Sequence, residues 1–183
     1  GVLRICREDG SLCEVGEPGD VYFEREELPF SYHNDPAKTK AAQHPEHPTW
    51  TTVGDVGYVD ADGFLFLTDR KAFLIISGGV NIYPQEIENL LITHPDVMDA
   101  AVFGIPDEDF GEAVKAVIQP VDPNGGTPEL AQLLREFCLA HLAKFKCPRT
   151  VDVIAALPRN PTGKILKREL RAPYWQGHDR TVV

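Results

Sequence analysis

Pro161-Thr162-Gly163-Lys164 is a segment of this 183-residue chain with the residue types for phosphate chemistry. It matches half of a P-loop, in which backbone N–H groups and a lysine bind phosphates. The full motif needs a glycine five residues before Gly163 and Ser or Thr after Lys164, but Pro158 and Ile165 occupy those positions. The P-loop interpretation therefore fails, and a lysine on such a loop is by itself more often a solvated charge.

Asp55 is a second candidate, because it follows Gly54 at the start of a predicted strand. A carboxylate in this position could accept two hydrogen bonds from vicinal hydroxyls such as those of a ribose. The same short pattern is more often an Asx turn, in which the carboxylate binds its own backbone. Asp55 alone therefore does not define a nucleotide site.

A third candidate begins with Asp69, Arg70 and Lys71, continues through the apolar run from Phe73 to Ile76, and ends at Ser77-Gly78-Gly79. The arginine could bind a phosphate or sugar, and the glycines could let a ligand lie close to the backbone. A solvated strand end followed by a tight turn is the more common structure for such a pattern.

Three further patterns fall short of a metal or hydrolase site. Asp60-Ala61-Asp62-Gly63 matches the start of a calcium loop, but the later ligands and the closing glutamate are misplaced. His44-Pro45-Glu46-His47 is not a His-Glu-x-x-His motif, and its proline prevents the helix that would place both imidazoles on one face. No Gly-x-Ser-x-Gly segment is present, so we expect neither a metal centre nor a serine hydrolase.

The elements that must position these candidates begin with short strands. Residues Val56–Asp60 and Phe64–Thr68 flank an Asp-Gly turn, which is typical of a β-hairpin, and Asp20–Glu24 is predicted as another strand. The polar run from Tyr32 to Pro48 has no periodicity and three prolines. It is predicted to be a surface loop.

From Arg70 onward, predicted strands alternate with helices. A short amphipathic helix lies between Pro84 and Pro95, and Thr127 and Pro128 supply the N-cap and first position of a second helix. The remaining predicted elements are strands over Phe73–Ile76, Val97–Ile105, Ala113–Val121 and Val151–Ile154, and a terminal basic helix over Ile165–Arg171.

These elements predict an α+β protein in two parts. A small β-rich part, residues 1–69, precedes a compact domain, residues 70–183, in which helices pack on one side of a small sheet in a βαββαβ-like order. The chain also starts without Met and inside a predicted strand. We therefore expect it to be a segment of a longer polypeptide.

Composition argues against several classes of function. A net charge of −10 and a pI near 5.0 do not supply the clustered cations that nucleic acids need. No apolar run approaches the roughly 18 to 20 residues of a membrane span, and the start lacks a signal-peptide pattern. We expect a cytoplasmic protein; peripheral contact with a membrane stays open but is not encoded in this segment. Its four cysteines lack Cys-x-x-Cys spacing and are expected to be free thiols.

Taken together and in order, these segments resemble consecutive signatures of the acyl-adenylate-forming superfamily, and specifically of AMP-forming acyl-CoA synthetases. The resemblance covers nearly the whole chain. It rests on Thr51 to Tyr58, Asp62-Gly63-Phe64, Thr68 to Lys71, Ser77 to Glu88, and Asn160 to Lys164. It implies that residues 1–69 end a large N-terminal adenylation domain and that residues 70–183 are a small, mobile C-terminal domain.

In this family a carboxylic acid attacks the α-phosphate of Mg-ATP to give acyl-AMP and pyrophosphate, and the thiol of CoA then displaces AMP. The C-terminal domain rotates between the two steps. The resemblance implies that Asp55 binds the ribose hydroxyls, that Arg70 binds the ribose and phosphate side, and that Lys164 is the catalytic lysine that bridges acid and phosphate. A compact ammonium on a long stem suits a transition state that joins two anions.

The resemblance also places Ser77, Gly78 and Gly79 at CoA, where a larger side chain would obstruct the thin pantetheine arm. Three basic residues near the second predicted helix could contact the phosphates of CoA, although an ordinary basic helix end is the more common explanation. These residues are Lys144, Lys146 and Arg149.

The hinge between the two parts is expected at Arg70, Lys71 and Ala72. In the family the position two after the arginine usually carries Asp or Lys, whereas this chain has Ala72 with Lys71 beside it. The departure leaves open which residue serves as the hinge.

The acid and the acyl acceptor also stay open. A fatty acid and CoA are preferred, and the alternatives are an adenylation domain that loads a carrier protein or a non-catalytic module derived from the same fold. The triphosphate loop, the magnesium-binding glutamate and the acyl pocket are expected to precede residue 1, in the chain's own N-terminal domain. The 183-residue segment alone is therefore expected to make no acyl-CoA.

Overall fold

The computed structural model describes residues 1–178 and divides the chain into two compact units between Ala72 and Phe73. The sequence placed the boundary between Asp69 and Arg70, three residues earlier. The difference has a local cause, because Arg70 is the last residue of a strand of the first unit. The next residue, Lys71, donates its backbone N–H to the Gly54 carbonyl of that unit at 2.9 Å.

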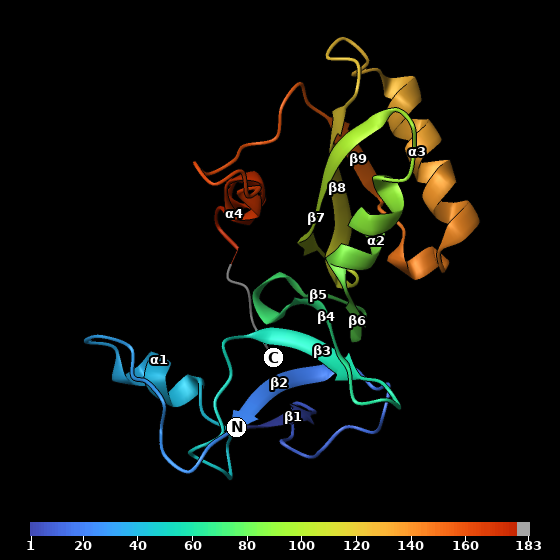
Figure 1. The fold of residues 1–183 in the computed structure, drawn as a ribbon. Coiled ribbons are helices and arrows are strands. Elements are labelled where there is room, and N and C mark those ends of the chain that lie inside the picture. Colours follow the sequence, from blue (N-terminus) through green and yellow to red (C-terminus); the bar gives the residue numbers. More distant parts are fainter. Residues whose placement is uncertain (179–183) are drawn as a thin grey trace. The chain divides into compact units, whose positions relative to one another are not determined.

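The first unit is built on a four-stranded antiparallel sheet in the order β1-β2-β3-β4 (Figure 1). Its strands are β1 (Val2–Cys6), β2 (Gly19–Glu24), β3 (Asp55–Val59) and β4 (Leu65–Arg70). The predicted hairpin is confirmed as β3 and β4. In its turn, Asp60 Oδ1 accepts the backbone N–H groups of Asp62 and Phe64 at 3.0 and 2.9 Å, and Gly63 has a φ of +86°.

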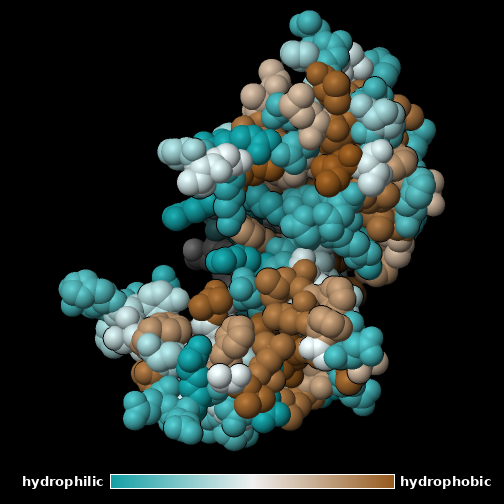
Figure 2. Space-filling model, in the orientation of Figure 1, coloured by the Kyte–Doolittle hydropathy of each residue, from teal (hydrophilic) through white to brown (hydrophobic). Residues whose placement is uncertain are grey.

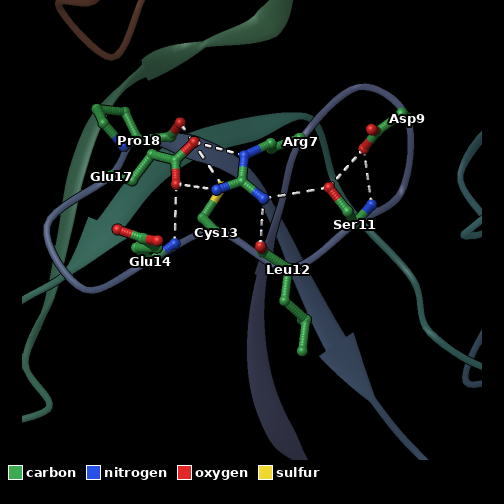
Figure 3. A network of polar contacts seen from close by, with 8 residues as sticks. All are labelled: Arg7, Asp9, Ser11, Leu12, Cys13, Glu14, Glu17 and Pro18. Atoms are coloured by element: carbon green, nitrogen blue, oxygen red, sulfur yellow. Dashed lines mark hydrogen bonds and ion pairs between the residues drawn. The ribbon is translucent and has the colours of Figure 1, made fainter.

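Arg7 holds the loop between β1 and β2 (Figure 3). Its guanidinium binds both carboxylate oxygens of Glu17, with Nε 2.6 Å from Oε1, and it donates to the Leu12 carbonyl at 2.7 Å. Glu17 also accepts the backbone N–H of Glu14 at 2.8 Å. The hydrogen bonds from Arg7 lower the pKa of Glu17. Arg7 and Glu17 thus pair with each other and close the loop.

The polar run from Tyr32 to Pro48 lies at the surface over most of its length, as predicted, but it is not all loop. Residues Pro36–Ala41 form the short helix α1, and His44 is only 1% exposed. His44 Nδ1 accepts the backbone N–H groups of Glu46 and His47, each at 3.2 Å, so the contact of Nε2 with the Gly10 carbonyl at 2.9 Å needs the proton on Nε2. This histidine is a satisfied core residue.

The second unit contains a five-stranded sheet with β8 at its centre. One edge of β8 pairs antiparallel with β7, and the other edge pairs with β5 at one end and in parallel with β9 further along. The strands are β5 (Ile75–Ser77), β6 (Val80–Ile82), β7 (Val97–Asp107), β8 (Gly111–Pro120) and β9 (Thr150–Val153).

Helices cover both faces of this sheet (Figure 1). On one face, α2 (Pro84–Leu91) and α3 (Pro128–His141) pack through Ile87, Leu91 and Leu134, which are fully buried. On the other face, Phe103 and Val117 pack against the segment that contains α4 (Lys167–Arg171). The α+β class is confirmed. The prediction that all helices pack on one side of the sheet is wrong, because β7 and β8 carry apolar residues on both faces and α4 packs on the second face.

Two predicted elements begin two residues later than the sequence indicated. The strand predicted from Phe73 begins at Ile75, since Lys71–Phe73 form the 3₁₀ turn η1. The last helix begins at Lys167 rather than Ile165, because Ile165 forms an isolated β-bridge with Arg159. Two further 3₁₀ turns are η2 (Lys144–Lys146) and η3 (Ala172–Trp175). Within residues 1–178, no helix has the length and apolar character needed to cross a membrane.

Adjacent leucines of α3 offer a test of this core. Leu134 is fully buried and Leu133 is 46% exposed. We expect Leu134→Ala to lower the free energy of unfolding of the second unit by about 2 to 5 kcal/mol, because it removes apolar contacts and leaves a cavity. Leu133→Ala, the matched control, should cost under about 1 kcal/mol in the same urea titration. Equal costs for the two variants would contradict the packing described here.

Candidate functional site

Asp55 and Arg70 are brought together by the β3–β4 hairpin. They are directly opposite each other in the ladder, and Arg70 Nε lies 3.2 Å from Asp55 Oδ1. The side chain of Asp55 is 23% exposed and that of Arg70 is 54% exposed. A carboxylate has room for about four hydrogen bonds, so Asp55 can keep Arg70 and still accept from two vicinal hydroxyls.

Lys71, the second predicted hinge residue, is anchored to the first unit by its side chain as well as its backbone. Its Nζ lies 2.6 Å from Oδ2 of Asp20, whose side chain is only 10% exposed. Arg70 and Lys71 therefore both make ion pairs within the first unit. A hinge in this segment would rotate about the bonds that follow Lys71, at Ala72 and Phe73, where the two units divide.

Ser77, Gly78 and Gly79 lie at the hairpin that joins β5 to β6. Ser77 pairs with Val80, so the loop has two residues, and these have φ values of +58° and +77° for Gly78 and Gly79. Two positive φ values are the requirement of a type I′ turn, which glycines meet without strain. Gly78 also donates its N–H to the Phe110 carbonyl at 2.8 Å.

The two glycines differ in the space around them. A Cβ on Gly78 would lie 3.1 Å from the Phe110 ring, whereas one on Gly79 would have no heavy atom of residues 1–178 within 4 Å besides its chain neighbours. A side chain at Gly79 would therefore project into open space beyond the turn. That space is the part of this hairpin that a ligand could approach.

Lys164 lies at the end of a loop whose backbone is closed by Asn160. Asn160 Oδ1 accepts the N–H of Thr162 at 3.1 Å and that of Lys164 at 2.8 Å, and the Asn160 N–H donates to the Lys164 carbonyl at 2.9 Å. Gly163, with a φ of +86°, lets the chain reverse. Lys164 is exposed, and within residues 1–178 its ammonium has no hydrogen bond or ion pair. The loop therefore presents a fixed backbone and an available positive charge.

Two ion pairs beside this loop were not expected from the sequence. Arg159, just before the loop, pairs with Asp99 of β7, and Lys167, just after it, pairs with Glu88 of α2. In the sequence, Glu88 stood only at the end of the segment Ser77 to Glu88 and had no role of its own. Its position one turn after Pro84, beside buried Ile87, was the available signal that it points inward.

The possible CoA-phosphate contacts are mostly engaged. Lys146 Nζ binds Glu86 at 2.7 Å, and Arg149 pairs with Asp107. Two of the three residues thus have carboxylate partners, which favours the ordinary surface ion pair over a phosphate site for Lys146 and Arg149. Lys144 is exposed on η2.

The structure thus joins the candidates into three local groups. Asp55 with Arg70 belongs to the first unit, whereas the Gly78-Gly79 turn and the Lys164 loop are separate parts of the second unit. Among residues 1–178, no group of three or more His, Cys, Asp or Glu side chains could hold a metal ion. No described residue is therefore assigned to magnesium.

The four cysteines are free, as expected. Cys6, Cys138 and Cys147 are buried, and burial raises the pKa of both Cys13 and Cys138 to about 11. The thiolate is the reactive form, and at pH 8 a pKa of about 11 lowers the thiolate fraction about 100-fold relative to free cysteine. A thiolate of higher pKa is also the stronger nucleophile, which offsets about tenfold of that loss.

We therefore expect Cys13 to react with an aromatic disulfide reagent at pH 8 about tenfold more slowly than free cysteine, and fully buried Cys138 to react more slowly still. Complete reaction of all four thiols should follow in denaturant. Peptide mapping after brief labelling would identify the sites, and labelling of Cys138 at the rate of free cysteine would contradict its burial.

Residues 86–164 match the family described as the AMP-binding enzyme C-terminal domain. This segment of the chain therefore belongs to the C-terminal domain family of the AMP-binding enzymes.

Similar proteins extend this match to nearly the whole chain. The chain is 41% identical over 172 residues to a long-chain-fatty-acid–CoA ligase of Mycobacterium tuberculosis (strain CDC 1551 / Oshkosh), covering 94% of this chain and 33% of that protein. It is 39% identical over 170 residues to a 2-succinylbenzoate–CoA ligase of Geobacillus sp. (strain WCH70), covering 92% of this chain and 33% of the relative.

A solved structure shows the same fold. ATP-bound MatB from Rhodopseudomonas palustris superposes with a TM-score of 0.81 at 31% identity, over 97% of this chain and 35% of that one. The chain thus spans about a third of the length of these relatives.

Proposed function

We propose that this chain is the C-terminal part of an AMP-forming acid–CoA ligase. The enzyme activates a carboxylic acid with Mg-ATP to acyl-AMP and pyrophosphate, and then transfers the acyl group to CoA with release of AMP. A fatty acid is the preferred substrate class. The similar proteins include a long-chain-fatty-acid ligase and a succinylbenzoate ligase, so they support the reaction type more closely than the acid.

The observation that carries this proposal is the presentation of Lys164. Its backbone is held by two hydrogen bonds with Asn160, while its ammonium is exposed and uncompensated by any group in residues 1–178. A lysine with only a solvation role would not need a closed loop beneath it. A fixed backbone carrying an available cation is the geometry that can stabilise charge in a transition state.

In the adenylation step, Lys164 binds the incoming carboxylate and the α-phosphate together. The acid oxygen forms a bond to phosphorus as the bond to pyrophosphate breaks, and the ammonium offsets the repulsion of the two anions. Asp55 accepts hydrogen bonds from the ribose hydroxyls, and Arg70 lies beside it for the ribose and phosphate side.

In the second step, the Gly78-Gly79 turn lies against the pantetheine arm. The CoA thiol sulfur forms a bond to the acyl carbon, AMP leaves, and the thiol proton goes to solvent or to a group outside this chain. The open space beyond Gly79 suits a thin substrate arm. Between the two steps the second unit rotates about Ala72, so that Lys164 leaves the reacting groups and the Gly78-Gly79 turn takes its place.

Exposed apolar residues on the β3–β4 hairpin support the proposal that a further domain packs against the first unit. Phe64, Phe66 and Leu67 of the β3–β4 hairpin are 66%, 45% and 59% exposed, and Figure 2 shows apolar atoms gathered on this unit. Exposed apolar side chains of this size, gathered on one small unit, are typical of an interface. We propose that the chain's own N-terminal domain covers it and supplies the triphosphate loop, the magnesium-binding glutamate and the acyl pocket.

Pyrophosphate release by the complete natural polypeptide, measured with ATP, Mg²⁺, CoA and a panel of short, long and aromatic acids, tests the proposal. We expect acid-dependent pyrophosphate and AMP, with one acid class preferred and acyl-CoA as product. Acyl transfer to a phosphopantetheinylated carrier protein but not to CoA would establish the carrier-loading alternative. No acid-dependent exchange of pyrophosphate into ATP would favour a non-catalytic module.

Residues 1–183 alone provide a second comparison. We expect this segment to form no acyl hydroxamate from ATP and fatty acid, because the groups assigned to the N-terminal domain are missing from it. Hydroxamate formation by the segment would contradict that assignment.

A further inference from the structure

On the outer edge of β7, side chains rather than a neighbouring strand form hydrogen bonds with backbone groups. Only β8 pairs with β7 among the strands of residues 1–178. On the outer edge, the Val102 N–H donates to Glu88 Oε1 at 2.6 Å, and the Gly104 carbonyl accepts from Arg171 Nε at 3.2 Å and Trp175 Nε1 at 3.0 Å. The segment that follows Lys164 is therefore fastened along this edge, which would otherwise expose unpaired backbone groups.

The Glu88–Lys167 ion pair is the most enclosed contact of that segment. Lys167 Nζ lies 2.6 Å from Glu88 Oε1, and the two side chains are 13% and 8% exposed. The ammonium also lies over the ring of Phe73, 5.2 Å from its centroid. Breaking such a pair leaves a buried charge, so Lys167 has little freedom to leave Glu88. Lys167 is three residues after Lys164.

A second pair restrains the other end of the loop. Arg159 pairs with Asp99 of β7, and its Nη1 donates to the Gly163 carbonyl at 2.9 Å. These side chains are 36% and 29% exposed, so solvent weakens this pair relative to the enclosed one. Both ends of the Lys164 loop are thus anchored to β7. Arg159 binds Asp99 of β7 directly, and Lys167 binds Glu88, which accepts the Val102 N–H of β7.

We propose that Glu88 and Lys167 are positioning residues that fix the Lys164 loop against β7 and thereby set where the Lys164 ammonium can reach. This inference rests on the proposed function, because it takes Lys164 as the adenylation lysine. The pair does not touch substrate. It acts through the backbone of residues 164–167, and its loss widens the range of loop positions.

The test compares Lys167→Met, which removes the charge but keeps an unbranched side chain, with Lys167→Arg, which keeps the charge. Arg168→Met is the matched control, because Arg168 is the next residue of α4 and is exposed. The complete natural polypeptide carries each change. Adenylation is followed by exchange of pyrophosphate into ATP, and thioester formation by adding CoA to prepared acyl-adenylate.

We expect Lys167→Met to lower kcat for adenylation about 10- to 100-fold, as a misplacement of about 1 Å would. KM for ATP and acid, and the rate from acyl-adenylate, should stay within about threefold, because the pair contacts neither ligand. Lys167→Arg should recover most of the loss, and Arg168→Met should have no effect. Unchanged adenylation in Lys167→Met, or equal loss in both half-reactions, would overturn the proposal.

Hydrogen exchange separates this inference from the proposed function. Lys167→Met should speed exchange of the hydrogen-bonded amides of Asn160, Gly163 and Lys164 by about tenfold or more, with β8 amides unchanged. Unaltered loop exchange would overturn the positioning role whatever the activity. Normal adenylation by Lys164→Ala would instead overturn the proposed function, while the exchange result would still decide whether the pair holds the loop.

Discussion

Lys164→Ala should lower the rate of acyl-adenylate formation about 100- to 1,000-fold. Loss of one preorganised cation or donor at a developing oxyanion costs about 3 to 4 kcal/mol, and joining a carboxylate to a phosphate concentrates charge in this way. The loop itself should keep its shape, because Asn160 binds the backbone of Lys164 and not its side chain. Exchange of pyrophosphate into ATP by the complete polypeptide would measure the loss.

Thioester formation from prepared acyl-adenylate should stay within about threefold in Lys164→Ala, because the lysine acts in the first step only. Arg168→Ala is the control, since it removes an exposed positive charge four residues away. Comparable losses in Lys164→Ala and Arg168→Ala would point to general charge attraction of ATP. Loss of both half-reactions in Lys164→Ala would contradict a lysine that leaves after the first step.

The second large effect is expected at Gly79. Gly79→Leu should spare acyl-adenylate formation and lower thioester formation about tenfold or more, because the new side chain enters the space proposed for the pantetheine arm and misplaces the thiol. Among the described residues, apart from the two chain neighbours, no heavy atom lies within 4 Å of the Cβ position, so the first atom of the leucine side chain has open space. The two half-reactions, measured separately, would show the selective loss.

Gly63→Leu is a matched control for backbone strain. Gly63 has a φ of +86° in the β3–β4 turn, Gly79 has a φ of +77°, and both have open space at Cβ. A leucine at either glycine costs about 1 to 2 kcal/mol for the left-handed backbone. Melting temperatures should therefore fall by similar amounts, while only Gly79→Leu slows thioester formation. Equal loss of both half-reactions in Gly79→Leu would contradict the assignment.

Local patterns predicted much of the secondary structure because the determining forces were local. The Asp-Gly turn between β3 and β4, and the cap of α3, in which Thr127 Oγ1 accepts the Leu130 N–H at 3.2 Å, depend on residues close in sequence. The helix from Lys167 began later than predicted, because Ile165 is held by Arg159 through a bridge that periodicity does not reveal.

The sequence was least informative about polar residues that become buried through tertiary contacts. His44 lies in a proline-rich polar run but is buried against Tyr22 and Trp50, with ring centroids 5.2 and 5.1 Å apart. Lys115 alternates with apolar residues of β8, a pattern typical of a solvated face, yet it is 4% exposed and pairs with Asp152 at 2.8 Å. Burial of such groups depends on partners distant in sequence.

The Lys164 loop shows the same division. The sequence by itself determined the loop, because Asn160, Gly163 and the residue order carry its turn chemistry, and the order of the motifs indicated its family. Only the tertiary structure decided what holds that loop, since Glu88 and Asp99 are separated from Lys167 and Arg159 by 79 and 60 residues. Hydrogen-bonded turns form between neighbours in sequence, whereas ion pairs across β7 exist only once the sheet has brought its partners together.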